Sequence, residues 1–171
     1  MTSSDGDMFD CSVEFPPGWV DVTDESPRTD DDPIIEARYY SETGRRLANL
    51  EIDSYGEEGV LRPSPDAVLP LVLDWSNADI TGEPEVTHPE LPAGPAMRVQ
   101  ATMRVKRMFG LRRKRAAFVK YVVYPPDMEN LVVVTVEWEA IARTEEIVRL
   151  VEEVVQAMSL TPLAADAEGS E

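Results

Sequence analysis

The sequence predicts an α+β fold: an antiparallel β-sheet with a C-terminal meander and helices packed on both faces, an α/β/α sandwich. The first observation behind this prediction is that apolar and polar residues alternate over long segments after residue 96, which is typical of strands. The second is that segments 64–77 and 144–158 carry apolar residues at helical spacing. Helices and strands in separate runs of the chain favour α+β layers over a parallel α/β fold.

Shorter strands are predicted in the N-terminal third. Cys11, Val13 and Phe15 alternate with polar residues, and the Pro-Pro-Gly sequence at 16–18 ends this strand before Trp19, which we expect to return the chain toward the core. Segments 34–40 and 47–55 follow as two strands joined by a turn at 41–44.

The segment 64–77 has the signals of a helix start. Ser64 can cap free amides, Pro65 suits the first helical position, and Asp66 faces the positive end of the helix dipole. Pro70 lacks an amide donor and crowds the preceding turn, so we expect a kink or a late start there. The apolar stripe consists of Val68, Leu71, Val72 and Trp75.

The meander is predicted from three alternating segments: 97–105, about 113–124 and 131–138. Placing their apolar residues on one face requires that Val99 pair with Tyr121, Ala101 with Val119 and Met103 with Ala117. A final helix, with Thr144 as its cap, would cover this face, and the 64–77 helix would cover the other. The apolar stripe of the final helix consists of Ile147, Val151, Val154, Val155 and Met158.

Length and charge limit the class of protein. The 171 residues fit a single domain over 8–162 with tails at 1–7 and 163–171. The chain has 33 acidic and 16 basic residues, a net charge of -17, which opposes nonspecific binding to nucleic acid. Without an apolar leader or an 18-residue apolar run, we expect a soluble, cytoplasmic protein. The oligomeric state is left open.

The order of these elements, together with the turn Phe15-Pro16-Pro17-Gly18-Trp19, resembles the PsbP-like superfamily. This superfamily includes an extrinsic protein of photosystem II, the Mog family of Ran-binding proteins and many bacterial relatives. The resemblance covers about residues 8–162. The resemblance implies a module that binds another protein. Members of this superfamily share no catalytic residues that could be assigned to this sequence.

The basic segment 104–115 (RVKRMFGLRRKR) is the candidate binding site. It holds seven of the sixteen Lys and Arg residues, and its apolar residues would lie at a hairpin tip inside a collar of cations. The interpretations are an internal salt-bridge network with residues 24–32 or the acidic tail, an acidic partner protein, an anionic membrane, or nucleic acid. Nucleic acid is disfavoured because the segment has no supporting basic face and no known motif. The candidate residues are Arg104, Lys106, Arg107, Met108, Phe109, Leu111, Arg112, Arg113, Lys114 and Arg115.

Catalytic and metal-binding patterns are weak. His88 is the only histidine and lies among prolines, whereas Cys11, the only cysteine, falls on an apolar strand face. The Asp30-Asp31-Asp32 run lacks the glycine and glutamate of a calcium loop. Glu137 and Glu139 share a strand face, but their expected neighbours are Lys120 and Arg104, which favours cross-strand ion pairing. We therefore predict no cofactor, no metal and no catalytic residue; an enzyme using Asp and Glu is a third alternative.

Overall fold

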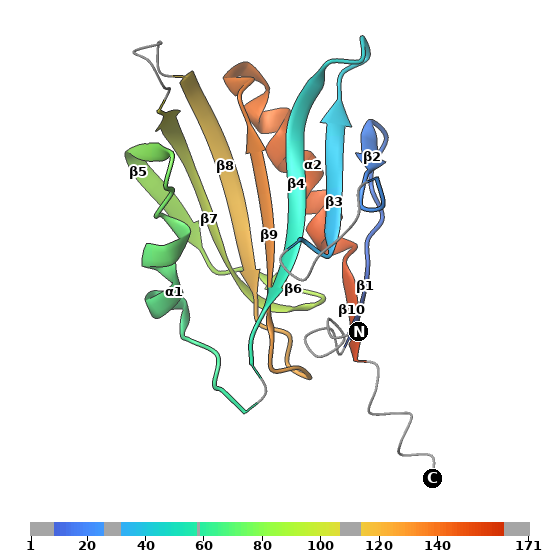
Figure 1. Cartoon of the computed structure of the whole chain (residues 1–171), viewed down its shortest axis with the longest axis vertical. Coiled ribbons are helices and arrows are strands. Elements are labelled where there is room, and N and C mark those ends of the chain that lie inside the picture. Colours follow the sequence, from blue (N-terminus) through green and yellow to red (C-terminus); the bar gives the residue numbers. More distant parts are fainter. Residues whose placement is uncertain (1–8, 26–31, 58, 107–113, 163–171) are drawn as a thin grey trace.

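A computed structural model describes residues 9–25, 32–57, 59–106 and 114–162 (Figure 1). In this part of the chain, an antiparallel sheet has the strand order β2-β3-β4-β9-β8-β7-β5, with β6 paired to β7, and β1 and β10 form a separate two-stranded sheet. The α+β class is confirmed; the predicted tails at 1–7 and 163–171 lie outside the described residues. The strands are β1 (Phe9–Ser12), β2 (Trp19–Asp21), β3 (Ile35–Tyr40), β4 (Arg46–Tyr55), β5 (Ala78–Thr87), β6 (Glu90–Leu91), β7 (Gly94–Val105), β8 (Lys114–Val123), β9 (Leu131–Trp138) and β10 (Ser159–Pro162).

Most predicted strands are present. β3 and β4 match the predicted segments within one residue, and Trp19 is buried as expected. Strand β5 was not predicted; it contains Gly82 and Pro84 and has an irregular register between Thr81 and Glu85. Glycine and proline in a strand interior mark bulges and weaken the alternating pattern on which the prediction depends.

Helix α1 (Pro65–Val72) begins as predicted, because the hydroxyl of Ser64 accepts a hydrogen bond from the Ala67 amide at 3.2 Å. The helix includes Pro70 but ends at Val72, five residues before the predicted end. Trp75 lies beyond it and donates its indole hydrogen to the carbonyl of Val72 at 3.1 Å. The helix is therefore short, and it covers only part of the sheet.

Helix α2 (Thr144–Gln156) follows a 3-10 turn, η3 (Ile141–Arg143). The predicted cap is wrong: the Thr144 hydroxyl donates to the Ile141 carbonyl at 2.7 Å and accepts the indole hydrogen of Trp138 at 2.9 Å. This side chain ties the helix start to β9 instead. No helix in the described ranges has the length and apolar character needed to cross a bilayer.

The predicted β7–β8 register is wrong by one residue. Val99 lies opposite Lys120, Ala101 opposite Phe118 and Met103 opposite Ala116. A shift of one residue moves a strand's side chains to the other face of the sheet. Met97, Val99, Ala101 and Met103 of β7 accordingly belong to the core cluster that contains α1, not to the one that contains α2.

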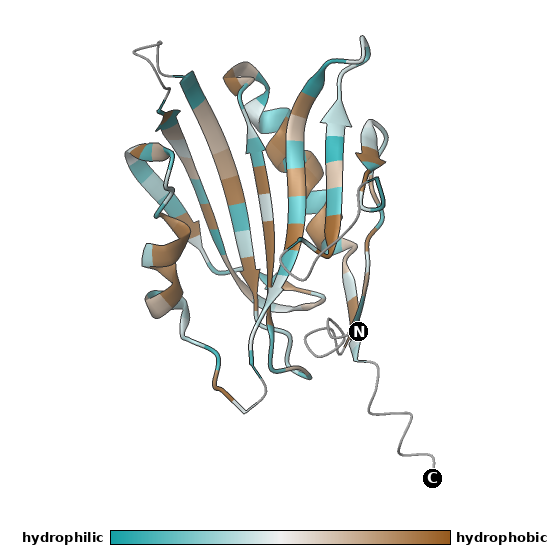
Figure 2. Ribbon diagram, viewed as in Figure 1, coloured by the Kyte–Doolittle hydropathy of each residue, from teal (hydrophilic) through white to brown (hydrophobic). Residues whose placement is uncertain are grey.

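Strand β8 supplies side chains to two separate core clusters. Ala117, Val119, Tyr121 and Val123 belong to the cluster that contains α2, and the alternate residues Ala116, Phe118 and Val122 belong to the cluster that contains α1. Figure 2 shows that β8 has longer apolar stretches than β4, where polar and apolar residues alternate. The center of the sheet is thus buried on both sides, while part of β4 faces solvent.

Phe118 is fully buried in the α1 cluster, with its ring centroid 4.9 Å from that of Trp75. We expect Phe118→Ala to lower the free energy of unfolding by about 3–5 kcal/mol, because the cavity cannot collapse inside the sheet. Urea denaturation would measure this loss. Val20→Ala, at a side chain that is 45% exposed, is the control and should cost less than about 1 kcal/mol. Equal losses for the two variants would contradict the assigned core.

Candidate functional site

The described part of the basic segment is the paired base of the β7–β8 hairpin. Arg104 lies directly opposite Arg115, and the side chains of both are exposed, as are those of Lys106 and Lys114. Like charges in cross-strand pairs repel, so this pairing does not serve strand stability. The other six predicted site residues, Arg107, Met108, Phe109, Leu111, Arg112 and Arg113, lie outside the described residues.

Ion pairs neutralise only part of this charge. Lys106 lies 3.7 Å from Asp79, and Lys114 lies 3.0 Å from Glu139, with all four side chains about half exposed or more. Exposed pairs of this kind contribute about 0–1 kcal/mol each. Within the described ranges, neither hairpin arginine has an ion pair, and the acidic partners of the lysines belong neither to 24–32 nor to the tail.

Sequence reasoning missed a second group of cations at the same end of the sheet. The register aligns Ala48, Trp138 and Ala117 in one row across β4, β9 and β8, so the first residues of β4 and β8 lie at the same edge of the sheet. Arg45 and Arg46 are exposed there and line a hollow of about 440 Å³, together with side chains from β7, β8 and β9. We call this surface the basic end; it consists of Arg45, Arg46, Arg104, Lys106, Lys114 and Arg115.

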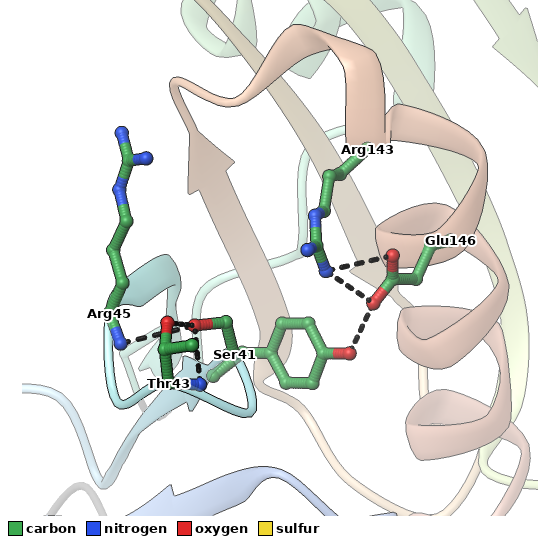
Figure 3. Close-up of polar contacts among 6 residues, drawn as sticks. Ser41, Thr43, Arg45, Arg143 and Glu146 are labelled. Atoms are coloured by element: carbon green, nitrogen blue, oxygen red, sulfur yellow. Dashed lines mark hydrogen bonds and ion pairs between the residues drawn. The ribbon is translucent and has the colours of Figure 1, made fainter.

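The turn before β4 holds Arg45 in place. The hydroxyl of Ser41 accepts a hydrogen bond from the backbone amide of Arg45 at 3.1 Å. Figure 3 shows that the guanidinium of Arg45 points away from the turn. Tyr39 ties the neighbouring strand to α2 by donating to the carboxylate of Glu146, which also lies 3.3 Å from Arg143. The hydrogen bond to Glu146, followed by burial, raises the pKa of Tyr39, so its hydroxyl stays protonated as a donor.

A row of carboxylates lies on the face that α1 leaves open. Glu51 and Asp53 on β4 and Glu137 on β9 surround Lys120 on β8; Lys120 is opposite Thr135 and therefore diagonal to Glu137, as predicted. Burial raises the pKa of all three carboxyl groups and lowers that of Lys120. Glu137 lines the hollow at the basic end, whereas Glu51 and Asp53 do not. The three carboxylates thus do not converge in that cavity as an acid and base would.

Other candidate residues are placed away from any catalytic arrangement. His88 is exposed in the loop between β5 and β6. Cys11 packs against the α2 cluster, and burial, with a smaller effect of Asp10, raises the pKa of its thiol to about 12. Among the described residues, no three His, Cys, Asp or Glu side chains are arranged to hold a metal ion. Asp30 and Asp31 lie outside this part of the chain.

Comparison with solved structures identifies the fold. No known family model matches the chain, and no curated protein is similar in sequence. LpqN of Mycobacterium tuberculosis, described as involved in cell envelope biogenesis, superposes with a TM-score of 0.56 at 13% identity, covering 90% of this chain and 84% of LpqN. The Ran-binding protein Mog1p of Saccharomyces cerevisiae gives a TM-score of 0.49 at 10% identity, covering 87% of this chain and 89% of Mog1p. The predicted resemblance to PsbP-like proteins is confirmed as a shared fold.

The raised pKa of Cys11 predicts an unreactive thiol. Because the thiolate is the reactive form, a shift from 9.0 to about 12 lowers its population at pH 8 roughly a thousandfold. We expect a disulfide reagent such as DTNB to label the native protein at a correspondingly lower rate than the urea-unfolded protein. Similar rates in the two states would show that Cys11 is accessible and ionised in the folded chain.

Proposed function

We propose that this chain, which has the PsbP-like fold, is a non-catalytic protein-binding or assembly module that engages an acidic surface of a partner protein through its basic end. The observation that carries this proposal is the set of four exposed arginines at one edge of the sheet. Arg45, Arg46, Arg104 and Arg115 have no ion pair within the described residues. The sequence contains three further arginines, Arg107, Arg112 and Arg113, between Lys106 and Lys114, outside the described residues.

Physical reasons favour an acidic protein. Arginine offers a planar fork of donors that matches a carboxylate, so a cluster of arginines selects for bidentate acidic contacts. The chain as a whole carries a charge of -17, but exposed charges farther away than about 8 Å are largely screened at physiological salt. The basic end can therefore attract an anionic surface although the rest of the molecule is acidic.

The rigid frame supports the same proposal. The two separate core clusters support one helix on each face of the sheet, an arrangement that leaves the strand ends uncovered. The arginines lie on ordered strands and on a turn that a hydrogen bond holds in place. Side chains held on a rigid scaffold lose less conformational freedom on binding. The described side chains that line the hollow at this end do not bring together the acid, base and nucleophile that an enzyme requires.

The cellular location of the module is a separate proposal. LpqN is described as involved in cell envelope biogenesis, whereas we propose a cytoplasmic location for this chain. Fractionation of the native organism, followed by detection of the chain with an antibody, would distinguish an envelope-assembly role from a cytoplasmic one.

The function is tested by charge reversal at the described arginines. We expect the Arg104→Glu/Arg115→Glu variant and the Arg45→Glu/Arg46→Glu variant each to lose the partner that wild type captures from lysate of the native organism. Affinity should fall at least about tenfold, since each pair of changes replaces two attractive contacts with two repulsive ones. The readout is quantitative mass spectrometry of the bound proteins.

Arg149→Glu is the control, because Arg149 is an exposed cation on α2 that does not line the hollow at the basic end. All variants should keep melting temperatures within a few degrees of wild type, since surface changes cost little stability. Unchanged capture by both double variants would remove the basic end from the function. Flotation with anionic liposomes by wild type alone would instead identify a membrane-binding protein.

A further inference from the structure

A single groove collects most of the exposed apolar side chains. Of the five large apolar residues exposed in the described part of the chain, Tyr55, Val60, Leu61 and Leu71 line this groove, and only Val20 lies elsewhere. Leu61 is 93% exposed and Leu71 is 69% exposed. The cavity has a volume of about 460 Å³ and lies between α1, the segment after β4 and the adjacent strands β8 and β9. We call it the apolar groove.

The wall that carries Val60 and Leu61 is tied to the body of the protein. The guanidinium of Arg62 donates to the carbonyls of Pro125 and Asn130 at 2.8 and 3.1 Å. Tyr124 donates its hydroxyl hydrogen to the carbonyl of Pro63 at 2.8 Å. Leu61 is therefore held in an exposed position by bonds on the residues that follow it, which is unfavourable in water unless something covers it.

The shape of the groove favours a macromolecule over a small ligand. Small-molecule sites bury most of the ligand surface. In this groove, however, the side chains of Leu61 and Leu71, which line it, are themselves mostly exposed. A volume near 460 Å³ accommodates a few bulky side chains of a polypeptide. The partner should thus insert apolar side chains from a protruding segment.

The charges around the groove determine which charged residues should flank the apolar side chains of the partner segment. Glu57 and Glu129 line the groove, and Glu51 and Asp53 continue the acidic surface along β4. The cations at the groove are Arg62, which is already bonded to two carbonyls, and Lys120, which lies over the ring of Trp75. Cationic flanks are favoured there, and an anionic bilayer is repelled.

One segment of this chain has the required chemistry. The sequence RVKRMFGLRRKR at 104–115 places Met108, Phe109 and Leu111 among seven cations. β8 begins with Lys114, and the groove includes Val122, eight residues farther along the same strand. At about 3.3 Å per residue, Val122 lies about 26 Å from Lys114, and Lys120, which also lines the groove, lies about 20 Å from it, which favours a segment supplied by a second molecule.

We propose that the apolar groove binds the basic segment 104–115 of a second copy of this chain, with the apolar side chains in the groove and the cations against its carboxylates. This inference rests on the proposed function and names the acidic partner surface. The contact joins two different surfaces, so copies assemble either head to tail or, when two copies exchange their segments, as a reciprocal dimer.

The test uses a fluorescent peptide of residues 104–115 and the full chain, with binding measured by anisotropy. We expect the Leu61→Ser/Leu71→Ser variant to bind the peptide at least about tenfold more weakly, because burial of these side chains supplies the apolar contact. The matched control is Val20→Ser, at the exposed apolar residue outside the groove, and its affinity should equal that of wild type. Both groove residues are exposed, so the double variant should remain folded.

A second peptide with Met108→Ser, Phe109→Ser and Leu111→Ser keeps the charge and removes the apolar contact. Equal binding of the two peptides, or equal binding by wild type and the groove variant, would reduce the effect to nonspecific charge attraction and overturn the inference. Sedimentation velocity of the full chain provides the second arm: wild type should form larger species with rising concentration, less so at high salt, and the groove variant should stay monomeric.

A wild-type chain that stays monomeric at concentrations where the peptide saturates it would also overturn the inference. The proposed function fails separately. If the peptide does not bind but the arginine variants still lose a captured protein, the basic end binds a different partner and only the second-copy occupant is wrong.

Discussion

The burial of β8 on both faces is the constraint on which the rest of the structure depends. Phe118 and Val122 pack toward α1, and Val119 and Tyr121 pack toward α2, so a single strand joins the two core clusters. Its pairing with β7 and β9 then fixes the register of the whole sheet. Because that register places Lys114 at one end and Val122 near the other, it also determines which end of the molecule carries the cations and which carries the apolar groove.

The same constraint explains where the sequence predicts the fold and where it does not. The meander, the β3–β4 pair, the Ser64 cap and both helices follow from local patterns, and the structure contains them. The β7–β8 register cannot be predicted in the same way, since both phases of the segment AAFVKYVV are apolar. A strand buried on both faces has no polar side to indicate its orientation. β5 was missed for the opposite reason, because Gly82 and Pro84 disrupt its pattern.

The candidate site shows a similar division. The basic segment is visible in the sequence because seven cations are adjacent along the chain. Arg45 and Arg46 are not, because only the pairing of β4 with β9 brings them to the same edge as Arg104 and Arg115. The apolar groove is also a product of tertiary structure: within α1, Val68 and Val72 are buried, whereas Leu71 is exposed although it fits the predicted buried stripe. Helical spacing indicates which residues share a face, but the packing of the helix on the sheet decides which of them are covered.

Opposite surfaces at the two ends of one strand give the molecule a direction. The basic end excludes another basic end by repulsion, and the acidic rim of the groove likewise excludes a second groove. Two copies can therefore pair these surfaces head to tail along β8, which leaves one basic end and one groove free, or in a reciprocal two-fold dimer, in which each basic segment occupies the groove of the other copy. With a net charge of -17 per chain, each added copy also increases the overall repulsion. The attraction between the basic segment and the groove must exceed that repulsion at every contact. Salt screens both this attraction and the repulsion between whole molecules, so ionic strength affects the size of the assembly in two opposing ways.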